Sequence, residues 1–296
     1  MSDHEHDHPH GHDHGHDHGH GHGHGHGHGH GHGHGHGHGH GPMIPPPTEL
    51  PGIRHVLLVG SGKGGVGKST VAFNLALALA GDGLKVGLLD GDLYGPSVPI
   101  LAGIQGERLG TNEHKILPVE KHGLKLVSLG LLLRDTDAIV WRGPLLHKTM
   151  RQFFLDVEWG ALDVLVVDLP PGTGDIQLSI SQLVKVSGAV VVTTPQELAF
   201  ADVLRAVKMF EKLGIPVLGL VENMAFFTAD DTGTTYWPFG KGRIAEHCAT
   251  HAVPHLGQIP IVPAIAAASD AGTPLAATAA ETAHYRKLAA ALRPSL

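Results

Sequence analysis

The sequence predicts an α/β fold: a doubly wound, mostly parallel sheet with helices on both faces, preceded by a disordered histidine-rich tail. Short aliphatic runs alternate with longer amphipathic stretches along most of the 296 residues. A glycine-rich loop joins the first run to the stretch after it, and a Gly-His repeat is confined to the N-terminus. Strands that alternate with helices along a chain favour parallel βαβ units in one domain.

Five aliphatic runs are predicted to be buried strands. They are near-continuous and do not alternate in polarity, which is typical of strands covered on both faces. These runs are residues 55–59, 86–89, 164–167, 189–193 and 217–221. Segments of helical length lie between them, at residues 69–80, 145–155, 176–186 and 199–213.

Residues 1–41 form a low-complexity tail. Every even-numbered residue from His4 to His40 is histidine, which accounts for 19 of the 27 histidines in the chain. Glycine occupies most of the intervening positions, so this segment cannot build a core and disorder is expected. The proline-rich stretch 42–50 is expected to be a stiff linker. Residues 51–296 are then the folded domain.

The folded domain is close to electrically neutral. The tail and linker hold six of the 28 acidic residues and none of the 21 basic ones, which leaves 22 acidic residues for the rest. A near-neutral domain does not favour nucleic acid or an anionic membrane as a partner. The single cysteine, Cys248, excludes an internal disulfide. With no signal-peptide segment and no apolar run of membrane-spanning length, a cytoplasmic location is expected.

The glycine-rich loop fits the pattern G-x-x-x-x-G-K-[ST]. It consists of Gly62, Lys63, Gly64, Gly65, Val66, Gly67, Lys68 and Ser69, followed by Thr70. It follows a predicted strand and precedes a predicted helix, which is the context that a phosphate-binding P-loop requires. Glycines let successive amide groups point at phosphate oxygens, and the helix N-terminus adds partial positive charge. We expect Lys68 to contact the β- and γ-phosphates and Ser69 to ligate Mg²⁺.

Acidic residues follow two of the predicted strands. Asp90 and Asp92 come after the run 86–89, and Asp168 comes after the run 164–167. The carboxyl ends of parallel strands form the edge where such sheets bind ligands. Asp168 is predicted to hold Mg²⁺ through water, Asp90 to lie near the metal, and Asp92 to orient the attacking water. A helix cap is the alternative role for each of them.

The sequence favours ATP over GTP. The guanine-reading pattern N-K-x-D is absent, whereas Pro195 and Asn223 follow the last two predicted strands. An asparagine side chain offers both a donor and an acceptor, which suits the edge of adenine. The alternative is that Asn223 is an ordinary turn residue.

A second lysine, Lys63, stands directly after the first glycine of the loop. This arrangement resembles the deviant Walker A signature of the ParA, MinD, nitrogenase iron protein and Mrp/ApbC group. In that group the lysine reaches the nucleotide of the partner subunit. The resemblance therefore implies an ATP-bound homodimer in which Lys63 is catalytic beside Lys68 and Asp92. The alternative is a solvated Lys63.

Further motifs resemble the Mrp/ApbC family in order and spacing over residues 50–292. They are GSGKGGVGKST, LLDGDLYGPSVP, WRGP at 141–144, VVDLPPGTGD, TTPQELAFADV and VENM. The resemblance implies a slow, Mg²⁺-dependent ATPase that carries or assembles iron–sulfur clusters for a client apo-protein. In that family a C-x-x-C after the N-M motif binds the cluster between two subunits.

The thiolate ligands of that family are missing here. Ala229 and Thr232 occupy the two cysteine positions, and neither a methyl nor a hydroxyl group replaces a thiolate on iron. Cys248 offers at most one thiolate per chain and is expected to be a small buried residue. The usual bridging cluster is therefore not expected, and ATP chemistry is better supported than cluster carriage.

The tail offers a second metal chemistry. Neutral imidazole suits Ni²⁺ and Zn²⁺, so the histidines of the tail are predicted metal ligands. The first of them are His4, His6, His8, His10, His12 and His14. The preferred function is an ATP-dependent metallochaperone of the iron–sulfur carrier type, with a client apo-protein or a metal-delivery partner. Two alternatives stay open: a MinD- or ParA-like positioning ATPase, and a protein-binding ATP switch without cluster carriage.

Overall fold

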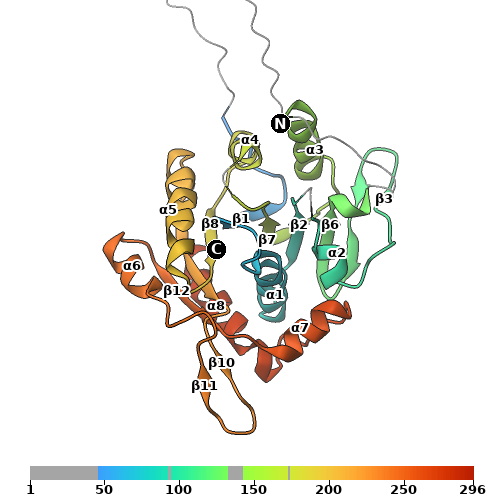
Figure 1. The fold of residues 1–296 in the computed structure, drawn as a ribbon. Helices are drawn as coiled ribbons and strands as arrows, with labels where there is room; N and C mark the ends of the chain where they lie inside the picture. The colour runs from blue at the N-terminus through green and yellow to red at the C-terminus, as the bar shows by residue number, and fades with distance from the viewer. Residues whose placement is uncertain (1–45, 93–94, 133–142, 173) are drawn as a thin grey trace, which may run out of the picture. The chain divides into compact units, whose positions relative to one another are not determined.

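An eight-stranded sheet lies at the centre of the computed structural model, in the order β12-β9-β8-β1-β7-β2-β6-β5 (Figure 1). Its neighbouring strands pair in parallel, except that β5 runs antiparallel to β6 at the edge. In sheet order the strands are β12 (His255–Ile259), β9 (Val217–Asn223), β8 (Gly188–Thr193), β1 (Ile53–Ser61), β7 (Leu162–Asp168), β2 (Val86–Asp90), β6 (Leu124–Ser128) and β5 (Val119–Lys121).

The structure describes residues 46–92, 95–132, 143–172 and 174–296. The chain's contacts separate Met1–Met43 from Ile44–Leu296. The histidine-rich tail and the first part of the linker lie outside the described residues, as do Trp141 and Arg142 of the WRGP motif.

Helices cover both faces of the sheet, so the predicted doubly wound α/β fold is confirmed (Figure 1). Helix α1 packs against α8 on one face, and α3 packs against α4 on the other. The helices are α1 (Lys68–Gly81), α2 (Val98–Leu101), α3 (Gly143–Leu155), α4 (Asp175–Leu183), α5 (Glu197–Lys212), α6 (Ile244–Thr250), α7 (Pro263–Asp270) and α8 (Ala283–Leu292). Two short ribbons lie outside the main sheet: β3 (Gly110–Thr111) pairs with β4 (Ile116–Leu117), and β10 (Phe227–Thr228) pairs with β11 (Thr235–Tyr236).

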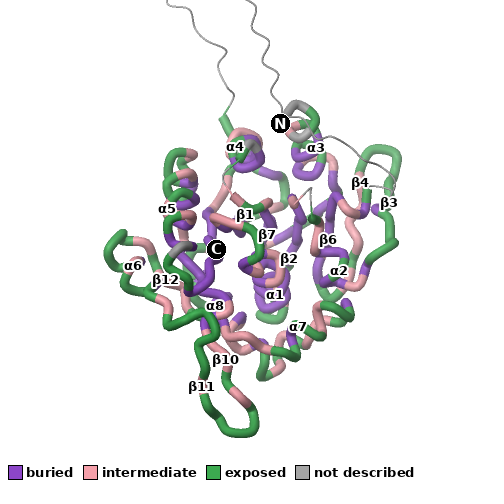
Figure 2. The backbone as a smooth tube through the Cα atoms, in the orientation of Figure 1, coloured by how far each residue is buried: buried purple, intermediate pink, exposed green. Residues whose placement is uncertain are grey.

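The core follows the central strands and helix α1 (Figure 2). Every residue of β2 and β8 is buried, as expected for aliphatic strands with helices on both faces. Helix α1 is buried on nearly all sides because it lies between the sheet and α8. Its many alanines allow this close packing, since small side chains let neighbouring elements approach.

The linker joins the folded body earlier than the sequence predicts. Thr48 pairs with Val184 in an isolated parallel bridge, and its amide donates to the Leu183 carbonyl at 3.0 Å. Leu50 is only 7% exposed. The same pairing explains why α4 ends at Leu183 and not at the predicted residue 186, because Val184 is extended.

Three strands of the sheet, β5, β6 and β12, were not predicted. β5 has only three residues, and two of them are charged. β6 and β12 mix apolar residues with Lys125, His255 and Gln258, so neither is a continuous aliphatic run. β12 is an edge strand and β6 lies next to the antiparallel edge strand β5. Strands in these positions are less fully covered, and they tolerate polar side chains.

Two glycines bring α2 and α7 into backbone contact. Gly103 and Gly272 each follow a helix end with positive φ, at 64° and 63°, the left-handed conformation common just beyond a helix. A Cβ atom on Gly103 would lie 2.3 Å from the Gly272 carbonyl oxygen. The contact therefore requires glycine for its space as well as its conformation.

We expect Gly103→Ala to lower the free energy of unfolding by about 3 kcal/mol or more, because strain at positive φ adds to a backbone clash. Gly106→Ala is the matched control: Gly106 also has positive φ, 81°, but no atom lies within 4 Å of an added Cβ. Its cost should be the strain alone, about 1–2 kcal/mol. Urea unfolding measures both, and equal losses would contradict the clash.

Candidate functional site

The P-loop connects β1 to α1 at the carboxyl edge of the sheet, and its glycines are fixed by their neighbours. Gly65 and Gly67 adopt φ of 78° and 77°. A Cβ on Gly67 would lie 2.3 Å from Asn223 Nδ2, and one on Gly62 would lie 2.4 Å from the Asp202 carbonyl carbon. The loop is therefore held between the end of β9 and helix α5.

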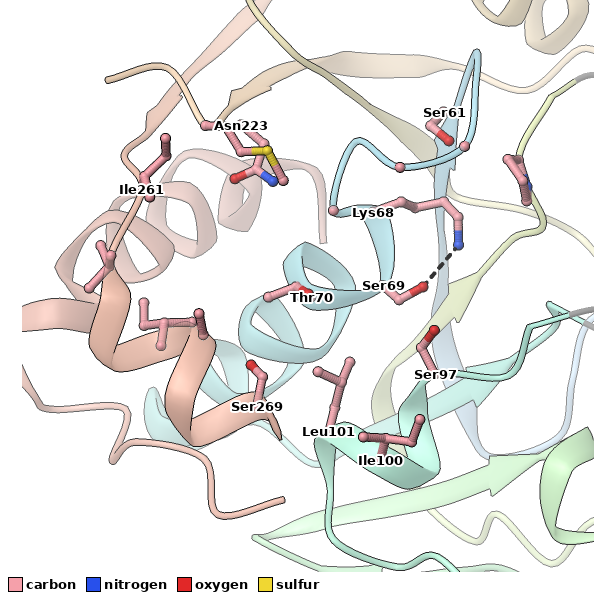
Figure 3. A pocket seen from close by; sticks show the side chains of 18 of the residues that line it. Ser61, Lys68, Ser69, Thr70, Ser97, Ile100, Leu101, Asn223, Ile261 and Ser269 are labelled. Carbon is pink, nitrogen blue, oxygen red and sulfur yellow. Dashed lines mark hydrogen bonds between the residues drawn. The ribbon is translucent and has the colours of Figure 1, made fainter. Parts of the chain in front are cut away.

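A cleft of about 640 Å³ opens in front of the loop, within the range of small-molecule sites. Ile100 and Leu101 of α2 and Ser269 of α7 lie beside one another along it (Figure 3). The predicted residues that line it are Lys63, Gly64, Gly65, Gly67, Lys68, Ser69, Thr70, Asp92 and Asn223. The structure thus brings together predicted residues from three separate parts of the sequence.

Lys68 and Asp168 form a buried ion pair, with 6% and 0% of their side chains exposed. Lys68 Nζ donates to Asp168 Oδ1 and also lies 3.3 Å from Ser69 Oγ (Figure 3). The pairing of β1 with β7 places the strand that precedes the P-loop beside the strand that ends at Asp168. The lysine predicted to bind phosphate therefore neutralises the aspartate predicted to hold Mg²⁺.

The second oxygen of Asp168 suits a metal shell. Asp168 Oδ2 is buried and accepts no hydrogen bond from the described residues. An unsatisfied buried carboxylate oxygen is costly, and Mg²⁺ with its bound waters would satisfy it. Burial raises the pKa of Asp168, although the Lys68 ammonium acts in the opposite direction. Asp168 and Ser69 therefore fit the Mg²⁺ of a nucleotide complex.

Asp90 lies beside Asp168, its partner in the β2–β7 register. Its Oδ2 accepts hydrogen bonds from Ser128 Oγ at 2.9 Å and the Val98 amide at 3.2 Å, and its Oδ1 accepts from the Asp92 amide at 3.1 Å. Burial, and next the charge of Asp168, raises the pKa of Asp90 to about 7. Asp90 therefore holds the turn that leads to α2, and its predicted position near the metal stays a prediction.

Lys63 lies at the mouth of the cleft. Its Nζ donates to Gln196 Oε1 at 3.2 Å, so its side chain is bonded within its own chain. Gln196 follows Pro195, which is buried at the end of β8. The contact is exposed, and a single exposed hydrogen bond is weak enough to be exchanged for a phosphate.

Asn223 is bonded to the P-loop itself. Its Nδ2 donates to the Val66 carbonyl at 2.8 Å, and the contact is buried. Asn223 also lines the cleft with Met224, which follows it with an unusual φ of 55°. Its predicted role at the adenine edge stays a prediction, and its role in holding the loop is an added observation.

Sequence reasoning missed the cleft residues that follow β12. Ile261, Val262 and Ile265 line the cleft with Phe239. The available signal was Pro260 and Pro263, which bracket a short apolar segment directly after the strand. Without β12 among the predicted strands, that segment could not be placed at the carboxyl edge.

The two positions of the missing thiolates lie between β10 and β11. The Ala229 amide donates to the Thr234 carbonyl at 2.9 Å, and Thr232 is exposed. Cys248 lies on α6 and is buried, as predicted, and burial raises the pKa of its thiol. In the described ranges, no three His, Cys, Asp or Glu side chains are grouped to hold a metal ion. The predicted ligands His4 to His14 lie outside these ranges.

The chain matches a known protein family and closely similar relatives. The family model described as ParA, NUBPL iron-transfer P-loop NTPase, matches residues 52–293. The iron-sulfur cluster carrier protein of Aquifex aeolicus is 54% identical over 229 residues, which cover 77% of this chain and 63% of that protein. The chain thus spans less than two thirds of that relative's length.

Solved structures agree with the fold. The nucleotide-binding protein of Archaeoglobus fulgidus, in complex with ADP, is 40% identical with a TM-score of 0.67, covering 75% of this chain and 87% of that one. The cell division ATPase MinD of Pyrococcus furiosus has a TM-score of 0.58 at 23% identity, covering 81% and 98%. No described helix is both long and apolar enough to cross a membrane.

The ion pair predicts competition between Lys68 and a divalent cation for Asp168. Lys68→Met should raise the affinity of the nucleotide-free protein for Mn²⁺, used in place of Mg²⁺, by about tenfold, because it removes a positive charge from the buried carboxylate. Calorimetry or electron paramagnetic resonance measures the affinity. Lys185→Met, at an exposed lysine paired with Glu49, is the control. The parent and both variants carry the same tail, so the tail does not contribute to a difference between them. Unchanged or weaker Mn²⁺ binding would contradict the competition.

Proposed function

Because the chain belongs to the NUBPL iron-transfer P-loop NTPase family, we propose that it is an ATP-hydrolysing metallochaperone of the iron–sulfur cluster carrier type. The observation that carries the proposal is the P-loop cleft, where Lys68, Ser69 and Asp168 meet. The A. aeolicus relative is named an iron-sulfur cluster carrier protein. Since the chain spans only part of that relative, activity, cargo and partners are all part of the proposal.

The proposed ATP chemistry follows from the cleft. The P-loop amides bind the phosphates, and Lys68 leaves Asp168 for the β- and γ-phosphates as these bring in negative charge. Ser69 and Asp168 would hold Mg²⁺, and the ion would supply positive charge to the phosphates. Asp92 lines the cleft and orients the attacking water. A polar side chain at Asn223 and a buried Pro195 form part of the adenine end.

Lys63 is proposed to act across a homodimer. In the single chain its ammonium donates to the exposed Gln196, and exchange of that bond for a partner's phosphate would be favourable by charge. Catalysis would then require two chains, and turnover by isolated chains would be slow. The A. fulgidus neighbour contains ADP, in agreement with an adenine nucleotide.

The proposed cargo differs from that of the family, because two cysteine ligands are missing from this sequence. Ala229 and Thr232 provide no thiolate, so a cluster would need other ligands. The histidine tail supplies imidazoles for Ni²⁺ or Zn²⁺, and delivery would go to a client apo-protein or a metal-delivery partner. These two substitutions also favour one alternative, an ATP switch that binds a protein without carrying a cluster. We propose a cytoplasmic location, and we propose neither a nucleic acid nor a membrane as a partner.

The dimer mechanism predicts that Lys63→Ala lowers kcat for ATP by about tenfold or more and changes the Kd for ATP by less than about threefold, because the lysine acts on the partner's transition state. Sedimentation with a slowly hydrolysed ATP analogue should show the parent dimerise and the variant dimerise less. Glu246→Gln, on exposed α6, should change neither. A chain that stays monomeric with every nucleotide would contradict the mechanism, and preference for GTP would contradict the adenine assignment.

The missing thiolates predict that anaerobic reconstitution with iron and sulfide gives no stable bridging [4Fe–4S] cluster in residues 46–296. The double variant Ala229→Cys, Thr232→Cys should gain one, because it restores two thiolates per chain. Absorption and Mössbauer spectra measure the cluster. The same experiment without residues 1–41 separates iron held by the tail. A cluster in the unmodified chain would show that other ligands suffice.

A further inference from the structure

Two buried polar side chains near the ends of β8 and β9 have an atom without a hydrogen-bond partner among the described residues. They are Thr194 Oγ1 and Glu222 Oε1. Glu222 is 1% exposed and pairs in register with Thr193. A buried carboxylate with an unsatisfied oxygen is destabilising. Such a carboxylate is kept where it belongs to a polar network, and the contacts of Glu222 therefore indicate its role.

The carboxylate of Glu222 is wedged between two chain segments. Its Oε2 accepts a hydrogen bond from Gln258 Nε2 at 2.7 Å. Its Oε1 faces the backbone of Gly242, where an added Cβ would lie 1.9 Å from this oxygen and 3.0 Å from Pro195 Cα. A side chain at Gly242 would therefore have to displace the buried carboxylate of Glu222.

Both neighbours of this carboxylate lead to the nucleotide cleft. Asn223, the next residue, donates to the Val66 carbonyl of the P-loop at 2.8 Å. Pro195 precedes Gln196, which accepts the hydrogen bond from Lys63 at 3.2 Å. A movement of the P-loop on nucleotide binding would therefore reach Glu222 through Asn223. A movement of Lys63 would reach it through Gln196 and Pro195, which lies beside Gly242.

The other end of this junction is a projecting ribbon. We define the arm as residues 225–242, which contain β10 and β11 and extend away from the sheet (Figure 1). It begins beside Met224 and ends at Gly242, and Phe239 on its return side lines the cleft. Lys241 Nζ lies 4.4 Å from the ring of the exposed Trp237. A two-stranded ribbon of this size has little stability of its own, so its placement depends on its two ends.

We propose that Glu222 is a positioning residue that couples nucleotide occupancy of the cleft to the placement of the arm. The inference rests on the proposed nucleotide binding and adds a route by which that binding reaches the arm. The carboxylate contacts the return end of the arm at Gly242, which in turn lies beside Pro195, the residue before the partner of Lys63. Glu222 also directly precedes Asn223, which holds the P-loop. When a nucleotide draws Lys63 and the P-loop to its phosphates, the packing around Glu222 changes and the arm moves with Gly242.

The test places a probe on the arm. The chain has one cysteine, so Thr232→Cys in a Cys248→Ala background gives a single thiol for a spin label at an exposed position. Mg²⁺ and a slowly hydrolysed ATP analogue should change the label's spectrum in this parent. Glu222→Asp keeps the charge of the side chain and withdraws the carboxylate from Gly242, and Gly242→Ala pushes the two segments apart. Each should reduce the spectral change by about fivefold or more, with Kd for the analogue within about threefold. Glu281→Gln, at an exposed residue outside the arm, is the matched control and should keep the full change.

The outcomes separate the coupling from the proposed function. A full spectral change in both variants would overturn the coupling, as would an unchanged label in a parent that binds the analogue. A loss of analogue binding in both variants, together with a lower Tm, would also overturn it, because Glu222 would then have a structural role only. A parent that binds no analogue would instead contradict the proposed function.

Discussion

Lys68 and Asp168 meet at the carboxyl edge of the sheet, where β1 and β7 run side by side and water is excluded. Removal of one partner from such a pair leaves an uncompensated buried charge, at a cost of about 3–5 kcal/mol. The pair exists because the P-loop turns directly after β1 and because Asp168 ends β7. The position of the loop, the free oxygen of Asp168 and the proposed metal site all depend on this contact.

The same edge concentrates negative charge. Asp90 and Asp168 are register partners, both fully buried, and their proximity contributes to the raised pKa of Asp90. Three donors hold Asp90 while Lys68 offsets Asp168. This arrangement is poised for a ligand, since a divalent cation would replace the lysine as counter-charge and release it to phosphate. Two neighbouring buried carboxylates lower the stability of the folded chain, and such a cost is typical of a binding site.

The arm and the cleft differ in how much of the family chemistry they retain. The cleft keeps the residues that ATP chemistry needs, whereas the arm lacks both thiolates at Ala229 and Thr232. A site is defined by its side chains and not by its fold, so the two can change separately. Glu222 and Gly242 connect them through packing alone. An arm that still responds to nucleotide could serve protein recognition even without a cluster.

Local patterns in the sequence determined much of this structure. Continuous aliphatic runs predicted five of the strands, and the loop from Gly62 to Ser69 predicted the phosphate site, because both signals depend on neighbouring residues. The strands β5, β6 and β12 were missed because polar residues interrupt them at less covered positions. The cleft wall after β12 was missed for the same reason.

Only the tertiary structure decided which partner each polar side chain takes. Asn223 bonds to Val66 across 157 residues of sequence, and Lys68 bonds to Asp168 across 100. The need for glycine at Gly103 and Gly242 likewise arises from distant backbone and side chains. No local pattern records such contacts, because they depend on how the sheet orders its strands. The sequence therefore determined the chemistry present in this protein, and the packing of distant segments decided how that chemistry is held.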